Sequence, residues 1–283
     1  MEAIIADTIV TKTMFRFPLE RSTNALSPEE YEHRFLQAVA DSFRAFRNDH
    51  LPLPEEVLKD TRTARRFFGI ERMLHSFFAK MFPSYLMNVA AKCPYQEVRQ
   101  EILRDCWDEE VSDPDAQGMC HIEVLHRDTE LLGVSREESE NFEPTPVLMA
   151  CTHALDNLSR VLPWEGGYAA IAGLETARVA VRKGYLCPDE DVVTARVAGR
   201  TLEELCALPK GSLMSGPLHA RKDLVHGGGA LKILRKYAAT REIQELTFWA
   251  VKTARSMRVI TNREQRRLAL AAIGLPADAL IVT

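Results

Sequence analysis

The sequence predicts an all-α protein, a single-domain bundle of about eight helices. Apolar residues recur at helical spacing along most of the chain, as at Tyr31, Phe35 and Val39. Helix start signals precede several of these stretches, and no segment alternates apolar and polar residues as a half-buried strand would. We expect residues 1–26 to form an N-terminal arm and residues 27–283 to form the domain.

The first two helical regions are bounded by proline and by capping residues. Ser27, Pro28 and Glu30 form an N-cap, a first-turn proline and a capping box, and the HLPLP segment ends this helix near residue 50. Residues 55–91 are helical again, and Pro83 should kink or interrupt them. Aromatic residues at helical spacing here predict packed core rather than a cofactor site, and His75 is assigned a structural role.

The next helix begins after Pro94 and ends in the carboxylates of residues 108–110. The loop SDPDAQG follows, and a new helix starts near His121 and stops at Gly133, a residue suited to a helix C-terminus. Residues 135–138 offer another capping box. Further helices are predicted over 147–162, over 165–184, from Pro188, around His219 to His226 and over 241–260, whereas 199–212 is less regular.

Composition excludes several classes of function. The net charge of −4 provides no basic field for nucleic acid. No apolar run is long enough to span a membrane, and the N-terminus lacks the pattern of a signal peptide. The 6 Cys are scattered without a CxxC pair, which indicates reduced thiols and a cytoplasmic setting. No GxGxxG, P-loop or heme-attachment motif indicates an organic cofactor.

The segment PLHARKDLVHGGGAL carries the strongest functional signal. It places His219, Asp223 and His226 within about 60° of one helix face, at about 100° of rotation per residue. Two imidazoles and a carboxylate on one face suit a transition metal such as iron. The alternative is a solvated face that happens to carry two histidines. Three glycines, 227–229, follow: they would make room for substrate, permit close helix contact, or end the helix early.

Further ligand-type residues lie upstream. Glu175 sits among small and apolar residues, and a buried carboxylate requires a partner, either a metal or Arg178. Glu109 or Glu110 and His121 fall at helix ends. Together with the three residues above, they would provide three carboxylates and three imidazoles, a suitable set for two iron or manganese ions in a helical bundle.

The chain lacks the Glu-x-x-His motifs of ferritin-like proteins. It instead resembles the heme-oxygenase-like diiron oxidases, whose helical fold is shared with thiaminase II and pyrroloquinoline-quinone synthase. The resemblance lies in four segments within residues 65–235: MFPSYLMNVAAKCP leading into WDEE, His121 with Gly133, the helix containing Glu175, and His219-x3-Asp223-x2-His226.

The resemblance implies a set of metal ligands and favours Glu109 over Glu110. The loop before His121 is longer than is usual in the family, which leaves His126 as an alternative to His121. The implied ligands are Glu109, His121, Glu175, His219, Asp223 and His226.

The resemblance also implies an enzyme that uses two Fe(II) ions, or manganese, with O2 as co-substrate. The expected reaction is N-oxygenation or oxidative C–C cleavage of a small amino-acid-derived substrate, typical of natural-product biosynthesis, and family members are commonly homodimers. Three alternatives remain open. They are a metal-independent enzyme like thiaminase II or the quinone synthase, oxidative decarboxylation of a fatty acid, and a non-catalytic protein that binds a partner or stores metal.

Overall fold

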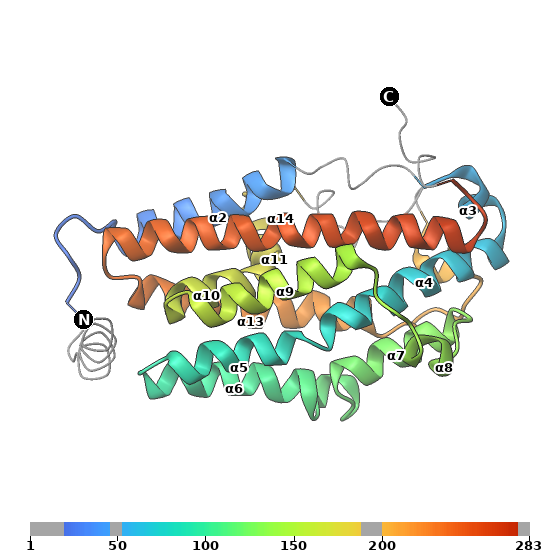
Figure 1. Cartoon of the computed structure of the whole chain (residues 1–283), viewed down its shortest axis with the longest axis horizontal. Coiled ribbons are helices and arrows are strands. Elements are labelled where there is room, and N and C mark those ends of the chain that lie inside the picture. The colour runs from blue at the N-terminus through green and yellow to red at the C-terminus, as the bar shows by residue number, and fades with distance from the viewer. Residues whose placement is uncertain (1–19, 46–52, 188–199, 277–283) are drawn as a thin grey trace.

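The computed structural model describes residues 20–45, 53–187 and 200–276, and within these ranges it contains helices and no extended strand. The predicted all-α class is therefore confirmed. The longest helix, α14 (Arg241–Ala272), runs the length of the molecule (Figure 1). Packed against it are α2 (Pro28–Ala45), α4 (Thr61–Ala79), α9 (Pro146–Val161) and α10 (Trp164–Ile171).

The remaining helices form the other side of the bundle. The antiparallel pair α5 (Phe82–Lys92) and α6 (Gln96–Glu110) lies along one edge, and α6 leads through the short 3-10 helix η2 (Pro114–Ala116) into α7 (His121–Leu131). Helix α13 (Ser215–Tyr237) contacts α6, α7 and the 3-10 helix η3 (Ala172–Thr176). Shorter helices are α3 (Glu55–Lys59), α8 (Arg136–Glu140), α11 (Ala177–Arg182) and α12 (Leu202–Leu205).

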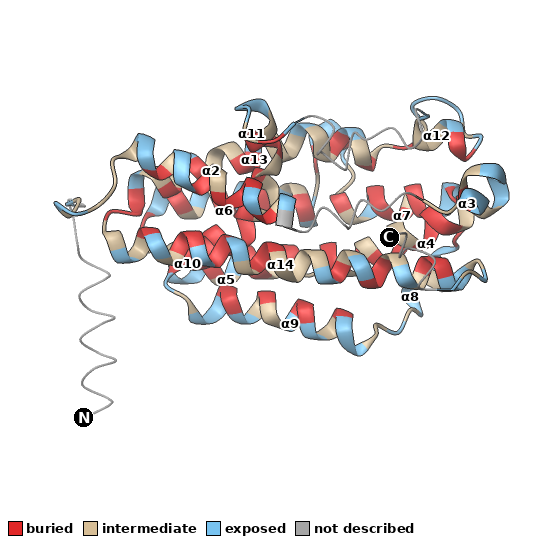
Figure 2. Cartoon of the chain, turned by 90° about the horizontal axis from the view of Figure 1, so that it is seen from above, coloured by how far each residue is buried: buried red, intermediate tan, exposed pale blue. Residues whose placement is uncertain are grey.

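Buried side chains line the inward faces of these helices (Figure 2). The larger apolar cluster includes Tyr31, Phe35, Tyr85 and Tyr168, all with 0% exposure, and joins α2, α5 and α10 to the first half of α14. A second cluster surrounds Phe67 on α4 and extends to the end of α14. The aromatic residues of 55–91 are thus core, as their helical spacing predicts.

Several predicted boundaries are correct because local signals set them. Ser27 and Glu30 form the expected reciprocal capping box. The backbone nitrogen of Ser27 lies 3.0 Å from Glu30 Oε2, and the backbone nitrogen of Glu30 lies 3.2 Å from Ser27 Oγ. Ser135 caps α8 through the backbone N–H of Glu138. Gly133 adopts φ 84°, a left-handed conformation that L side chains rarely adopt, directly after α7.

Other boundaries differ from the prediction. The 55–91 region forms three helices. Asp60 caps the second of them, and the helical run is interrupted again just before Pro83, which lies in the first turn of α5. The 165–184 run is interrupted by η3, and 199–212 contains the capped helix α12. Helix α14 continues beyond residue 260 because its second half packs against α4.

Some predictions fall on parts of the chain that are not described. Most of the arm at 1–26 lies outside, and its described part, residues 20–26, contains no helix. The end of the first helix near residue 50 and the helix expected from Pro188 also lie outside. Among the described residues, no helix combines the length and apolarity that a membrane crossing requires.

Candidate metal centre

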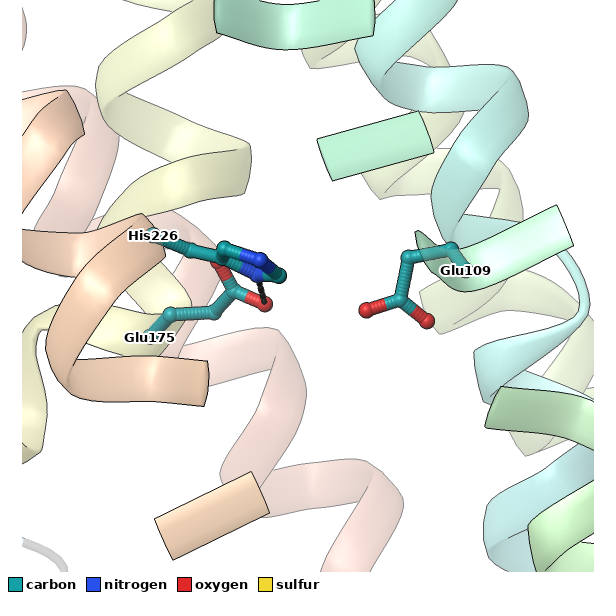
Figure 3. A group of neighbouring side chains, drawn as sticks. All are labelled: Glu109, Glu175 and His226. Carbon is teal, nitrogen blue, oxygen red and sulfur yellow. Dashed lines mark ion pairs between the residues drawn. The ribbon is translucent and has the colours of Figure 1, made fainter. Parts of the chain in front are cut away.

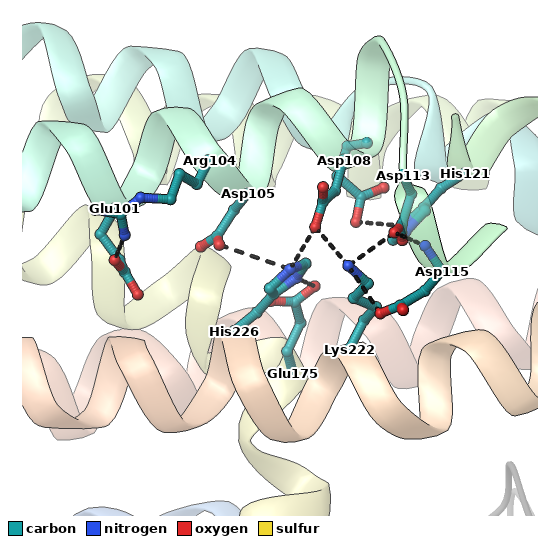
Figure 4. A network of polar contacts seen from close by, with 11 residues as sticks. Glu101, Arg104, Asp105, Asp108, Asp113, Asp115, His121, Glu175, Lys222 and His226 are labelled. Atoms are coloured by element: carbon teal, nitrogen blue, oxygen red, sulfur yellow. Dashed lines mark hydrogen bonds and ion pairs between the residues drawn. The ribbon is translucent and has the colours of Figure 1, made fainter. Parts of the chain in front are cut away.

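The six predicted ligands gather where α6, α7, α13 and η3 meet. Figure 4 shows α6 and α13 running side by side with acidic side chains from α6 facing His226 and Lys222 from α13. The long range of these contacts explains why the site is not visible as one local motif. Its ligand-type residues come from four segments that only the fold brings together.

Three of the predicted residues form the tightest group. Glu109, Glu175 and His226 each present one potential ligand atom, and these atoms lie within 4.8 Å of one another. Figure 3 shows Glu109 facing the other two across the gap between α6 and α13. Glu109 and His226 are buried, with 5% and 4% exposure. This spacing would allow one cation to contact all three side chains.

His121 joins the group through Glu109. Its Nδ1 lies 2.8 Å from Glu109 Oε1, and its Nε2 lies 2.9 Å from Asp113 Oδ2. Burial alone lowers the pKa of His121, but the hydrogen bonds and charges of these two carboxylates outweigh it and raise the pKa to about 9. In the metal-free protein, His121 is therefore a protonated imidazolium at neutral pH. A metal bound at the nitrogen facing Glu109 would replace that proton.

His219 is in the opposite protonation state. Burial lowers its pKa to about 4, so the ring is neutral. Its Nδ1 donates to the carbonyl oxygen of Ser215 at 2.7 Å, which leaves the Nε2 lone pair available. The ring centroid lies 5.2 Å from that of His121. A neutral imidazole fixed by a backbone carbonyl has the form in which histidine binds metals.

Asp223 lies beside Arg178, with 3.5 Å between Oδ2 and Nε. Arg178, the alternative partner for Glu175, is thus paired with Asp223 in the described part of the chain. Burial and the nearby charge of Glu175 raise the pKa of Asp223 well above its usual value. Because the charge of Glu175 opposes ionisation of Asp223, an additional positive charge would favour the state in which both are ionised.

The two alternatives lie elsewhere. The side chain of Glu110 is exposed on the outer face of α6, whereas Glu109 points inward. His126 is surrounded by the charges of Lys80, Arg136 and α8 rather than by the group around Glu109. Geometry therefore brings Glu109 and His121 to the centre and leaves Glu110 and His126 outside it.

Four polar residues of the centre were not predicted. Asp105 and Asp108 lie on α6 near His226 Nε2, at 3.6 and 3.5 Å. Lys222 Nζ contacts both Asp108 and Asp113 at 2.8 Å. The sequence contained a signal for two of them: Asp105 precedes Glu109 by one helical turn, and Lys222 precedes His226 by one turn. Asp113 lies in a loop whose path the sequence does not define.

This arrangement fits divalent cations. His226 Nδ1 is buried without a hydrogen-bond partner and lies 3.6 Å from Glu175 Oε1. Burial raises the pKa of Asp105 to about 7, and the charges of Glu175, Glu101 and Glu109 add to the rise while that of His226 opposes it. Mixed carboxylate and imidazole donors suit iron or manganese.

Close contact between α13 and η3 places Glu175. Among the three glycines, Gly227 lies against the backbone of residues 175 and 176: a Cβ there would be 2.7 Å from the carbonyl oxygen of Glu175. Gly228 has open space around it. Helix α13 continues through all three, so an early helix end is ruled out, and close helix contact explains Gly227.

Comparisons with known proteins agree with this architecture. No protein-family model and no curated protein sequence matches the chain. Among solved structures, a domain of unknown function with a heme oxygenase-like fold from Shewanella denitrificans superposes with a TM-score of 0.61 at 14% identity, covering 81% of this chain and 89% of that one.

The chain has the heme-oxygenase-like fold. A TenA homolog from Pseudomonas syringae pv. tomato gives a TM-score of 0.57 at 14% identity, covering 87% of this chain and 98% of that one. The predicted heme-oxygenase-like bundle is thereby confirmed. Identity this low establishes the heme-oxygenase-like fold alone, so the chemistry must be argued from the side chains.

Proposed function

We propose that this heme-oxygenase-like protein is a non-heme diiron oxidase. It would bind two Fe(II) or Mn ions between α6, α7, α13 and η3 and use O2 to oxidise a small amino-acid-derived substrate, by N-oxygenation or C–C cleavage, in a natural-product pathway. The observation that carries the proposal is the buried group of Glu109, Glu175 and His226. The six ligands would be Glu109, His121, Glu175, His219, Asp223 and His226.

The bound metals would supply the electrons and the Lewis acidity that dioxygen chemistry requires. The chain's own contribution is to fix the ligands and exclude water. Asp113 holds one nitrogen of His121, so the nitrogen that faces Glu109 would be the one that binds metal. Lys222 in turn holds Asp113, whose side chain has no exposure. Ser215 fixes the tautomer of His219.

The metal-independent alternative receives less support from the side chains. An enzyme of that kind with a cysteine nucleophile would need a thiol that ionises readily. Burial raises the pKa of Cys93 and of Cys106 to about 12 and that of Cys206 to about 11. Among the described residues, no cysteine belongs to the group around Glu109. The likeness to a TenA homolog keeps this alternative as an outcome of the experiment below.

The deciding experiment is anaerobic titration of metal-free protein with Fe(II), followed by rapid mixing with O2. We expect saturation near two irons per chain and a transient visible absorption after mixing. Glu109→Gln should weaken iron binding by at least an order of magnitude. Its neighbour Glu110→Gln is a matched control, because it removes an exposed charge of the same type, and it should bind iron like the wild type.

Other results would point elsewhere. Absence of iron binding, or iron binding without any reaction with O2, would contradict the diiron proposal and favour a metal-independent enzyme. Uptake of many irons per chain would indicate storage. Equal loss in the Glu109 and Glu110 variants would show that the effect is one of general charge, not of ligation.

A further inference from the structure

Helix α14 carries two arginines, Arg255 and Arg258, three residues apart on one face. Arg255 is 8% exposed. Arg258 is partly exposed as a residue, but its Nη1 is buried and has no hydrogen-bond partner. Among the described residues, no carboxylate oxygen lies within 4.0 Å of either guanidinium, and the charge of Asp223 acts on Arg255 only from beyond that distance.

Their remaining contacts do not balance the charge. Arg255 Nη1 donates to the carbonyl oxygen of Leu174 at 3.3 Å, and its guanidinium lies 3.9 Å from the ring centroid of Phe43. Arg258 Nη2 donates to His75 Nδ1 at 2.7 Å, and its guanidinium lies 4.5 Å from the ring centroid of Phe78. A ring face and a neutral acceptor return only part of the hydration energy that a buried guanidinium loses.

Both arginines remain charged at neutral pH. Burial lowers the pKa of Arg255 to about 9 and that of Arg258 to about 10, and both values lie above 7. Most buried arginines of folded proteins are paired with an acid. Two such charges without a described acid in ion-pair contact, beside apolar rings, have the character of a site for an anion from outside.

The two guanidiniums border the proposed metal centre. Arg255 contacts the carbonyl of Leu174, the residue directly before Glu175. Arg258 contacts His75, whose ring centroid lies 6.2 Å from that of His219. The arginines thus approach from the side of α14, whereas Glu109 and Asp105 approach from α6.

We infer that Arg255 and Arg258 bind the carboxylate of a small organic acid, the substrate of the metal centre. This substrate assignment rests on the proposed function, whereas the anion site itself does not. Guanidinium groups match the geometry of a carboxylate. The rings of Phe43 and Phe78 beside them favour a monoanion with an apolar chain over phosphate, because a dianion would lose more hydration energy in such surroundings.

The test uses full-length, metal-free protein in EDTA, so that a carboxylate cannot bind through a metal. Hexanoate and hexanamide are matched probes, of which only the first is charged, and they are compared by calorimetry and thermal unfolding at constant ionic strength. We expect hexanoate, but not hexanamide, to bind and to raise Tm. Arg255→Met and Arg258→Met should each weaken hexanoate binding at least tenfold. Arg241→Met, which changes a partly exposed arginine at the start of α14 paired with Glu245, is the control.

Unliganded stability separates binding from a structural role. Because each methionine variant removes an uncompensated buried charge, its Tm without probe should equal or exceed that of the wild type. Hexanoate affinity that survives both substitutions, or equal binding of hexanoate and hexanamide to the wild type, would overturn the inference. Absence of hexanoate binding to the wild type would also overturn the inference. Equally tight binding of inorganic phosphate would overturn the carboxylate assignment.

The two proposals can fail separately. Hexanoate binding with no uptake of iron would retain the anion site and reject the diiron centre. Uptake of two irons per chain with no hexanoate binding would retain the diiron centre and reject the anion site. If a methionine variant does not fold, the hexanoate and hexanamide comparison on the wild type still decides, and Arg258→Lys supplies a second variant that retains the charge.

Discussion

Replacement of Gly227 by alanine tests how the fold positions Glu175. A Cβ at Gly227 would lie 2.7 Å from the carbonyl oxygen of Glu175 and 2.9 Å from its carbonyl carbon. The nearer contact is about 0.7 Å inside the 3.4 Å at which ordinary contact begins. Because the opposing atoms belong to the backbone of η3, η3 itself must move. Gly228, the next residue, has nothing within 4 Å of its Cβ position and provides the control.

The expected magnitudes follow from two opposing effects. Alanine stabilises a helix by about 1 kcal/mol relative to glycine, and Gly228→Ala should gain about that amount. At Gly227 the same gain is opposed by overpacking, which typically costs about 1–3 kcal/mol. Gly227→Ala should therefore be less stable than Gly228→Ala by roughly 1–3 kcal/mol. It should also bind metal roughly tenfold or more weakly, because Glu175 moves with η3.

Urea unfolding of the metal-free variants measures the first effect, and anaerobic Fe(II) titration measures the second. Both variants should keep the helical circular dichroism of the wild type. If Gly227→Ala is as stable as Gly228→Ala and binds iron equally well, the contact between α13 and η3 does not position Glu175. A loss of stability with unchanged iron affinity would show that η3 adapts without moving the carboxylate.

Three further predictions concern charge. The ordinary pKa of histidine predicts that iron affinity falls only below about pH 6. Because carboxylates raise the pKa of His121 to about 9 and of His226 to about 10 against the effect of burial, affinity should instead keep rising from pH 6 to 9. Calorimetry in two buffers at pH 7 should then detect about two protons released per protein. Lys222→Met should destabilise the metal-free protein by roughly 2–4 kcal/mol in urea unfolding, because it removes the ammonium that pairs with Asp108 and Asp113, whereas the exposed Lys232→Met should have little effect. Burial raises the pKa of Glu165 from 4.5 to about 7, so its protonated form stabilises the folded state at low pH and that contribution is lost as pH rises from about 4.5 to 7. Glu165→Gln should therefore flatten the decline in unfolding free energy between pH 5 and 8 by roughly 1–2 kcal/mol, and a wild-type profile without that decline would contradict the assignment.

Sequence reasoning located the helices where a local signal acts. The capping box at Ser27 and the left-handed Gly133 are encoded within a few residues, and both were predicted correctly. The break at η3 was not predicted, because it depends on contact with Gly227, about fifty residues further along the chain. The same distinction holds for the continuation of α14 past residue 260, which depends on its packing against α4.

The candidate centre divides in the same way. His219, Asp223 and His226 share one face of α13, so helical spacing alone groups them. Asp113 lies in the loop after α6, and nothing in the sequence shows that it reaches His121. The buried arginines of α14 were also missed, since spacing cannot distinguish a buried arginine from a surface one. Their meaning depends on the absence of an acid within ion-pair distance among the described residues.

Charge balance explains why the acids of this centre divide into two groups. Burial opposes the charge of Lys222, but Asp108 and Asp113 raise its pKa above the usual value, so it remains an ammonium and stays bound to both. These two carboxylates are therefore already compensated. Glu109 pairs with His121 and Glu175 lies beside His226, and a metal can replace the protons of these imidazoles without moving Lys222. Cations would therefore enter between Glu109, Glu175 and His226 rather than beside Lys222.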